Sequence, residues 1–357
     1  MVRIIRYLLL PFAVLYGILV RTRHFLYDSG WLVSKTFETP TICVGNLSVG
    51  GTGKTPMIEY LIRFLKNDFT IGVLSRGYKR KTKGFVLANE KTTVADVGDE
   101  PLQFWTKYPE IILAVDANRS QGITALEALP NAPEVILLDD AFQHRKVKAT
   151  CNVLLTAYPD LFTYDWLLPT GNLRDVTSRV ALADVIVVTK CPNVLPEEQQ
   201  QTLTRKLRKR DGQPVFFAKI NYAKSVLSQT EVITLESFLQ KSFVLVTGIA
   251  KAQPLVDFLK SQKGNFKHIA FPDHHNFTTE ELRKLSQHSR ILTTEKDYMR
   301  LKEHLPDLFY LPIEMGFLNM KQQNEFERII RSKIRKKIKF SEPFFVRSVI
   351  FLYFCFD

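Results

Sequence analysis

The sequence predicts an α/β fold built around a doubly wound, mainly parallel β-sheet. From residue 40 onward, short runs of consecutive apolar residues alternate with stretches of helical pattern. Strands of a parallel sheet are buried on both faces and therefore read as unbroken apolar runs. A glycine-rich turn at 50–55 joins the first run to a helix, and acidic residues end later runs. The predicted strands of this core are 41–45, 70–75, 111–115, 135–139, 152–156 and 184–189.

Composition limits the class of protein before any motif is considered. The chain has 357 residues, 45% of them hydrophobic, which is enough for two domains with buried cores. Its four cysteines are scattered without a C-x-x-C pair, which argues against a disulfide framework or a structural zinc and favours a reducing compartment. The net charge of +13 favours an anionic partner: nucleic acid, an anionic membrane surface or a phosphorylated substrate.

Residues 1–35 form the first predicted unit, in which an apolar stretch at 4–20 is bordered by basic residues. The stretch is slightly short for a membrane-spanning helix, which needs about 20 apolar residues. A secretory signal is excluded because Arg21-Thr22-Arg23-His24 stands where small residues would mark the cleavage site. A helix packed on the protein's own core and an interfacial membrane anchor remain, and the basic flanks favour the anchor.

The most informative motif is Gly50-Gly51-Thr52-Gly53-Lys54-Thr55. A glycine-rich turn that opens a helix directs several backbone N–H groups at one point, where the helix N-terminus adds partial positive charge. Lys54 is placed to reach the β- and γ-phosphates of a nucleotide, and the Thr55 hydroxyl to bind Mg²⁺. Ser48 replaces the first glycine of G-x-x-x-x-G-K-[ST], so Gly50 and Gly51 supply the backbone freedom instead. The motif predicts that the chain binds a nucleoside triphosphate.

The core domain, predicted at 36–225, carries further charged residues near the expected ligand edge of the sheet. The strand at 135–139 ends in Asp139 and Asp140. A magnesium ion bound by Thr55 needs an acidic partner from a neighbouring strand, and either aspartate could be the nearer one. Three arginines follow predicted strands or loops at this edge, where each could hold an anionic substrate or a phosphoryl group. They are Arg76, Arg119 and Arg174.

Two further polar clusters have alternative interpretations. Asp99-Glu100 stands between a glycine and a proline, where it could cap a helix or act as general base for an acceptor hydroxyl. Asp273-His274-His275 follows a predicted strand and could bind a metal or relay a proton. Adjacent residues of an extended chain point to opposite sides, so the relay is favoured, with one imidazole polarising a carboxylate.

A smaller α/β domain is predicted at 226–340, joined to the first by a hairpin between 214–221 and 231–235. The basic run at 331–340 is either a solvated helix face or a membrane contact. Residues 341–357 form an apolar tail of unknown role. Further elements are expected at 243–247, 253–261, 267–271, 279–287, 290–293 and 308–313.

Taken together, these residues resemble the tetraacyldisaccharide 4′-kinase family of lipid A biosynthesis. The resemblance spans roughly residues 5–300 in the order expected of the family, with Ala141 where glycine is expected. It rests on the N-terminal helix with Pro11, Val44-Gly45-Asn46, the 50–56 turn, Ser75-Arg76-Gly77-Tyr78, Gly98-Asp99-Glu100-Pro101, Asp139-Asp140-Ala141-Phe142-Gln143-His144, Gly171-Asn172-Leu173-Arg174 and Asp273-His274-His275.

The resemblance implies a P-loop kinase, peripheral or monotopic, on the cytoplasmic face of the inner membrane of a Gram-negative bacterium. ATP would phosphorylate the 4′-hydroxyl of a tetraacylated glucosamine disaccharide 1-phosphate, giving lipid IVA. Asp99 would be the base, assisted by His274 or His275, with Lys54 and Arg174 as further catalytic residues. A monomer that binds no nucleic acid is expected. The implied substrate contacts are Asn46, Arg76, Glu100, Arg119 and Asn172.

A rival interpretation is a switch ATPase of the ParA/MinD type, which uses ATP to dimerise and bind DNA or membrane. The signature lysine of those proteins would fall at Val49, which is apolar, so this interpretation is less favoured. No helix-turn-helix or zinc pattern supports DNA binding. An ATP-dependent dimer would favour the switch, and a monomer the kinase.

Overall fold

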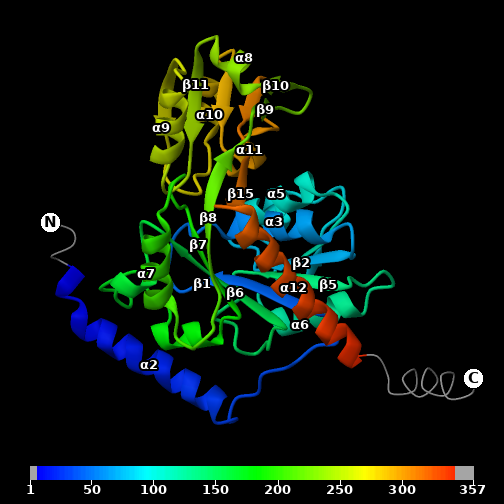
Figure 1. The fold of residues 1–357 in the computed structure, drawn as a ribbon. Helices are drawn as coiled ribbons and strands as arrows, with labels where there is room; N and C mark the ends of the chain where they lie inside the picture. Colours follow the sequence, from blue (N-terminus) through cyan, green and yellow to red (C-terminus); the bar gives the residue numbers. More distant parts are fainter. Residues whose placement is uncertain (1–5, 342–357) are drawn as a thin grey trace, which may run out of the picture.

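A computed structural model describes residues 6–341, in which a nine-stranded sheet and a six-stranded sheet are stacked end to end (Figure 1). The expectations for residues 1–5 and 342–357 lie outside the described part. The larger sheet has the order β15-β8-β7-β6-β1-β5-β2-β4-β3. Its strands are β1 (Thr41–Asn46), β2 (Ile71–Ser75), β3 (Val86–Leu87), β4 (Ile112–Val115), β5 (Val135–Asp139), β6 (Cys151–Ala157), β7 (Val185–Thr189), β8 (Val215–Tyr222) and β15 (Ile313–Phe317).

All neighbours from β8 to β4 pair in parallel, and only the edge strands β15 and β3 run antiparallel. Alternate residues of each strand face two different apolar layers: Val153 and Leu155 pack on one side of β6, and Leu154 on the other. The predicted doubly wound parallel sheet is therefore confirmed. The helices that cover it are α3 (Lys54–Leu65), α4 (Val94–Val97), α5 (Asp99–Lys107), α6 (Arg119–Glu127), α7 (Glu197–Leu207) and α12 (Met320–Ser341).

The second sheet, of order β10-β9-β14-β13-β11-β12, lies at the top of Figure 1. Its strands are β9 (Ser225–Leu227), β10 (Val232–Thr234), β11 (Phe243–Thr247), β12 (Phe266–Ala270), β13 (Ile291–Thr293) and β14 (Leu308–Tyr310). Its helices are α8 (Leu235–Leu239), α9 (Gln253–Ser261), α10 (Thr279–Leu285) and α11 (Glu295–Leu301). A separate apolar cluster around Phe238 and Leu245 gives this sheet its own core.

The predicted hairpin between 214–221 and 231–235 is wrong. Strand β8 pairs instead with β15, with Tyr222 opposite Ile313, while β10 pairs with β9. The reason is burial, because Phe216 of β8 and Phe317 of β15 join the same apolar cluster as the core of the larger sheet. Residues 313–340, expected in the smaller domain, thus return to the larger sheet; the other domain bounds stay a prediction.

Helix α12 completes this return. Phe326, Ile330 and Ile334 recur every four residues, are fully buried, and belong to the core cluster of the larger sheet. Such spacing puts the three side chains on one helix face, which fixes the rotation of α12 about its axis. The opposite face of the helix is consequently directed to solvent.

Helix α2 (Leu10–Asp28) lies along the outside of the molecule, at the end away from the six-stranded sheet (Figure 1). Only Ala13, Gly17 and His24 are buried in it. Its large apolar side chains are exposed instead: Leu10, Phe12, Val14, Leu15, Ile18, Leu19 and Phe25. Within residues 6–341, no helix has the length and apolarity that crossing a membrane requires.

Candidate active site

The phosphate-binding loop leaves β1 and enters α3 at the carboxyl edge of the larger sheet. Gly53 caps α3 with φ +87°, a left-handed conformation that favours glycine. A Cβ there would lie 3.3 Å from Met315 Cε, so β15 forms part of the wall behind the loop. The loop is also tied to β7, because Thr189 Oγ1 donates to the Thr52 carbonyl at 2.7 Å. The turn thus has the backbone geometry that the motif predicts.

Asn46, at the end of β1, joins two cations of the site. Its Oδ1 accepts a hydrogen bond from Lys54 Nζ at 3.5 Å and another from Arg174 Nη2. Lys54 Nζ also lies 3.6 Å from Asp140 Oδ1. Lys54 is therefore held by polar partners beside the loop rather than extended into solvent.

The two aspartates at the end of β5 differ in their surroundings. Asp140 forms an ion pair with Arg174, whose Nη1 donates to Oδ2 at 3.0 Å. Burial raises the pKa of Asp140, but the hydrogen bond from Arg174 and the charge of Lys54 outweigh this and lower it. Burial, with the charges of Glu100 and Asp140, instead raises the pKa of Asp139 to about 6. The carboxylate of Asp140 is thus paired with Arg174 and Lys54, whereas that of Asp139 forms no ion pair among residues 6–341.

Asp139 retains a free ligand atom. Its Oδ2 accepts from Ser75 Oγ at 2.9 Å, but its buried Oδ1 has no hydrogen-bond partner among residues 6–341. A buried, unpaired carboxylate oxygen beside a phosphate loop fits a divalent cation, which prefers oxygen ligands. No cluster of three or more His, Cys, Asp or Glu in the described part could hold a metal by itself. Such a site suits Mg²⁺, which takes few protein ligands and completes its shell with phosphate and water.

Asp99, the first residue of α5, is buried and faces residues of the second domain. Its Oδ2 lies 2.9 Å from His274 Nδ1 and forms an ion pair with Arg300 Nη2. Arg300 Nη2 also lies 2.7 Å from His274 Nδ1. Burial alone raises the pKa of Asp99, but the His274 hydrogen bond and the Arg300 charge hold it well below its usual range. Asp99 is therefore ionised throughout the neutral pH range.

The structure distinguishes the two adjacent histidines. His274 has φ +56° and contacts Asp99, while His275 Nε2 lies 2.9 Å from Glu281 Oε2. Glu281 forms the capping box of α10 with Thr278, so His275 belongs to the packing of the second domain. The alternatives for the partner of Asp99 are thereby reduced to His274.

Helix α11 contributes residues that sequence reasoning missed. Lys296 forms an ion pair with Glu100, next to the pair between Arg300 and Asp99. Lys296 and Arg300 are four residues apart and so share one helix face, which meets the two adjacent acids at the start of α5. The spacing of Lys296 and Arg300 indicates a basic helix face, but only the fold shows that this face lies opposite Asp99-Glu100. The second domain therefore contacts Asp99 through His274 and Arg300, and Glu100 through Lys296.

The remaining predicted contacts differ in accessibility. Arg76 is exposed just beyond β2. Arg119 is only 1% exposed, and its guanidinium donates to the carbonyl oxygens of Asp116 and Asp139. Arg119 thus supports the strand end that carries Asp139, and little of it is left for a ligand. Asn172 accepts a hydrogen bond from Arg6 Nη1 at 3.1 Å, so this loop meets the segment that precedes α2.

Helix α2 and the loop that carries Arg174 are joined at several points. Tyr16 donates its hydroxyl hydrogen to the Arg174 carbonyl at 2.8 Å. His24 Nε2 lies 2.6 Å from Asp175 Oδ1, and both side chains are buried. A contact of this kind is closely fixed, because a buried charged group is costly to leave unpaired. Helix α2 is therefore joined by hydrogen bonds to the loop that carries Arg174.

A glycine-rich loop that opens a helix at the carboxyl edge of a doubly wound sheet, with an unpaired carboxylate oxygen on Asp139 and an ionised Asp99 in contact with His274, is the arrangement of a P-loop kinase. The family model described as tetraacyldisaccharide-1-P 4′-kinase (LpxK) matches residues 5–335. The chain belongs to this family.

Relatives and a solved structure agree with this membership. A tetraacyldisaccharide 4′-kinase of Flavobacterium johnsoniae is 47% identical, with 94% of this chain and 99% of the relative covered. One of Bacteroides thetaiotaomicron is 39% identical, with 93% and 94% covered. The crystal structure of LpxK from Aquifex aeolicus in complex with ATP superposes with a TM-score of 0.75 at 32% identity, over 92% of this chain and 99% of that one.

Proposed function

We propose that the chain transfers the γ-phosphoryl group of ATP to the 4′-hydroxyl of a tetraacylated glucosamine disaccharide 1-phosphate, giving lipid IVA. One observation carries the proposal beyond ATP binding: an ionised carboxylate, Asp99, is held by His274, and its chain neighbour Glu100 lies near enough to Asp139 to raise the pKa of that aspartate. A pure ATP switch needs no base of this kind. The relatives named tetraacyldisaccharide 4′-kinase supply the identity of the acceptor.

The nucleotide would be bound by the backbone of Gly50, Gly51, Thr52 and Gly53 at the N-terminus of α3. The amide groups there and the helix dipole favour phosphate. Lys54 would reach the β- and γ-phosphates from its place beside Asn46, and thereby neutralise charge as the phosphoryl group moves.

Magnesium would be held by the Thr55 hydroxyl and Asp139, whose Oδ1 is the unpaired oxygen, with Asp140 behind it. When bound, the ion would neutralise negative charge on the phosphates. Loss of a proton from Asp139 is favoured near neutral pH, since its pKa is about 6. The carboxylate would therefore be available as a ligand in the cell.

Asp99 would accept the proton of the 4′-hydroxyl, and His274 would orient the carboxylate. A carboxylate of low pKa is a weak base, but phosphoryl transfer passes through a loose transition state in which charge neutralisation and positioning dominate. Early removal of the proton is not required under those conditions. His274 and Arg300 would thus act by keeping Asp99 ionised and by orienting its carboxylate toward the 4′-hydroxyl.

The acceptor lipid would be contacted by Arg174, Asn46, Asn172, Arg76 and Glu100, with Arg119 supporting the strand end from beneath. Helix α2 would lie in the membrane interface on the cytoplasmic face of the inner membrane, with its exposed apolar side chains in the lipid. Lifting the acyl chains from the bilayer would cost about 0.8 kcal/mol per CH₂ group, so the enzyme must work at the surface. A monomer is sufficient for this arrangement.

The test is transfer of ³²P from γ-labelled ATP to the tetraacylated disaccharide 1-phosphate in detergent micelles, for wild type and Asp99→Ala. Labelled lipid from the wild type, and loss of turnover with ATP binding retained in the variant, is the expected result. A chelator should stop the transfer. ATP hydrolysis without labelled lipid, accompanied by an ATP-dependent dimer, would favour the switch ATPase instead.

A further inference from the structure

Lys190, the residue that follows β7, has a backbone conformation that is rare for its type. Its φ is +55°, in the left-handed region that lysine seldom adopts. Asp140, directly after β5, has φ +49°, and His274 has φ +56°. Both of these residues belong to the candidate active site. Strained backbone of this kind collects at functional sites, so Lys190 is a candidate for a function of its own.

The side chain of Lys190 reaches the phosphate loop. Its Nζ donates to the Gly51 carbonyl oxygen at 2.5 Å, and a Cβ added to Gly51 would lie 3.7 Å from the same nitrogen. The preceding residue, Thr189, donates to the next carbonyl of the loop, that of Thr52. Two consecutive residues after β6 thus hold two consecutive carbonyl groups of the loop.

These two contacts fix the side of the loop that faces away from a ligand. Phosphate is bound by backbone N–H groups, so the carbonyl oxygens of such a loop turn away from it and need other partners. A hydrogen bond donated by an ammonium group is charge-assisted and about twice as strong as a neutral one. Lys190 is therefore the stronger of the two holds on the loop.

The order of the strands places Lys190 away from the candidate magnesium ligand. In the larger sheet, β5 is next to β1 on one side, and β6 and then β7 follow on the other. Asp139 and Asp140 end β5, and Lys54 Nζ lies 3.6 Å from Asp140. Lys190 approaches from the β7 side instead. The loop is thus held at both flanks by different residues.

Lys190 lies in surroundings that disfavour a further cation. Burial lowers its pKa and the charge of Lys251 adds to this effect, whereas Asp160 opposes it. Lys251 comes from the second domain and forms an ion pair with Asp160. A cation in such a place is costly unless an anion is near. The phosphates of a bound nucleotide would supply that negative charge.

We propose that Lys190 is a positioning residue of the ATP site, which holds the phosphate loop in its binding conformation through the Gly51 carbonyl. The inference deepens the proposed function and rests on it, since it places ATP on this loop. Without Lys190 the Gly51 peptide is free to rotate, so part of the binding free energy of ATP would go into ordering the loop.

The experiment measures the affinity of the full chain for ATP with Mg²⁺, and separately for inorganic tripolyphosphate, by calorimetry. Lys190→Met removes the charge. Lys190→Asn suits the left-handed backbone but is too short to reach Gly51, and Lys190→Arg can donate to the same carbonyl. Thermal unfolding without nucleotide checks that each variant is folded.

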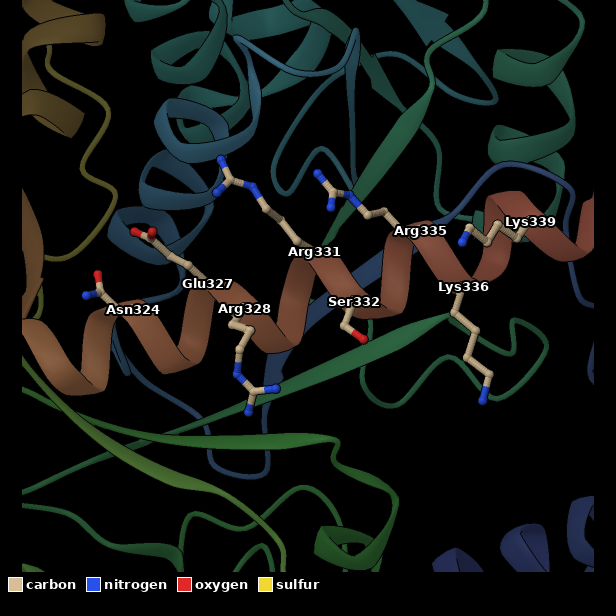
Figure 2. A pocket seen from close by; sticks show the side chains of 8 residues that line it. All are labelled: Asn324, Glu327, Arg328, Arg331, Ser332, Arg335, Lys336 and Lys339. Atoms are coloured by element: carbon tan, nitrogen blue, oxygen red, sulfur yellow. The ribbon is translucent and has the colours of Figure 1, made fainter.

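The matched control is Lys336→Met, which lowers the net charge equally. Figure 2 shows Lys336 on α12, where it lines a hollow of about 720 Å³ formed by residues of that helix. It is exposed, so its replacement should leave the phosphate loop as it is.

Lys190→Met and Lys190→Asn should bind ATP about ten-fold more weakly, because a hydrogen bond from a charged group is lost. The loss should be equal for tripolyphosphate. Lys190→Arg should retain most of the affinity, and Lys336→Met all of it. In steady-state kinetics, KM for ATP should rise by the same factor while KM for the acceptor lipid stays unchanged. A purely structural role would change both KM values.

Unchanged ATP affinity in both Lys190→Met and Lys190→Asn would overturn the proposal. An equal loss in Lys336→Met would do so too, since net charge alone would then explain it. A loss for ATP that tripolyphosphate does not share would place the side chain at the nucleoside and contradict a role through the loop. If the expected ATP affinities are found but the wild type labels no lipid, the proposed kinase fails and the role of Lys190 stands.

Discussion

At the scale of single residues, Arg300 controls the charge of the candidate base. It contacts Asp99 Oδ2 and His274 Nδ1 together, and Asp297 Oδ1 lies 3.7 Å from its Nη1. Burial acts to raise the pKa of Asp99, and the hydrogen bond with His274 and the charge of Arg300 together outweigh it, so Arg300 helps to keep this carboxyl ionised. Arg300 thus acts through Asp99 as a positioning residue.

We expect Arg300→Met to raise the pKa of Asp99, so that the acidic limb of the kcat–pH profile moves up by about 1–3 pH units. The sign follows from the base, which must be unprotonated to accept the hydroxyl proton and now protonates at higher pH. The measurement is kcat against pH at saturating ATP and acceptor.

Arg300→Lys serves as the matched control, since it keeps a cation near Asp99. It should retain most of the wild-type pH profile even if the rate falls. An acidic limb that stays in place in Arg300→Met, with ATP affinity also unchanged, would contradict the role assigned to Arg300.

The predictability of the site differs between its residues for a physical reason. The turn at Gly50–Thr55 and the acids Asp139 and Asp140 were predictable because each lies within one strand–turn unit, where local sequence fixes the geometry. Arg300 was not predicted, because its function depends on the packing of α11 against α5, which brings it to Asp99 from 201 residues away in the chain. Whether the predicted residues carry the roles assigned to them stays a prediction.

At the scale of elements, the seating of α2 depends on Gly17. A Cβ at this position would lie 2.9 Å from Leu167 Cδ1 and 2.8 Å from Arg21 Nη1. The helix therefore approaches the 165–175 segment closely at the one place where it has no side chain. This close approach allows the hydrogen bond from Tyr16 to the Arg174 carbonyl.

We expect Gly17→Val to lift α2 from this segment and to lower kcat/KM for the acceptor lipid by roughly ten-fold, since forced overpacking costs about 1–3 kcal/mol. The affinity for ATP should stay unchanged, because within residues 6–341 the side-chain hydrogen bonds that α2 makes to the nucleotide-binding domain go to the 143–145 and 174–175 segments rather than to residues 50–55. Steady-state kinetics with lipid in micelles, and ATP binding by calorimetry, measure the two quantities. Ile18→Val, on the exposed side of the same helix, should leave both unchanged; equal losses in the two variants would rule out the seating effect.

The strands were predictable where burial on both faces of the sheet requires an unbroken run of apolar residues, as in β1, β5 and β7. The pairing of each strand with its neighbours was less predictable, as the wrongly predicted hairpin between β8 and β10 demonstrates. Both β10 and β15 contain apolar residues that could pair with β8, and only the core of the larger sheet decides in favour of β15. Pairing between strands separated by a whole domain leaves no local trace.

At the scale of the whole molecule, one partly buried lysine joins helices of both domains. Lys107 Nζ lies 2.6 Å from Glu59 Oε2 of α3 and 2.7 Å from Glu295 Oε1 of α11. One cation thus faces two carboxylates. Burial, with the charge of Glu59, raises the pKa of Glu295 to about 7, although Lys107 opposes this.

A raised pKa of an acid stabilises the protonated form in the folded state. The folded chain then holds a proton that the unfolded chain releases above pH of about 4.5, so stability falls as pH rises from there to about 7. We expect Glu295→Gln, which stays neutral, to lose this pH dependence, worth about 3 kcal/mol. Thermal unfolding of both proteins across this pH range is the measurement. The exposed Glu303→Gln should behave as wild type, and parallel curves for wild type and Glu295→Gln would refute the assignment.

The antiparallel pairing of β8 with β15 has an evolutionary consequence. Tyr222 stands opposite Ile313, and Ala223 N donates to the Pro312 carbonyl at 2.9 Å, so the polypeptide departs from and rejoins the nucleotide-binding sheet at facing positions. A tight turn would bridge this gap, which makes residues 224–311 a cassette that one recombination event could insert into an ancestral hairpin. His274, Lys296 and Arg300 all lie within this segment. Insertion of this segment would have added the partners of Asp99 in a single step to a protein that already bound phosphate.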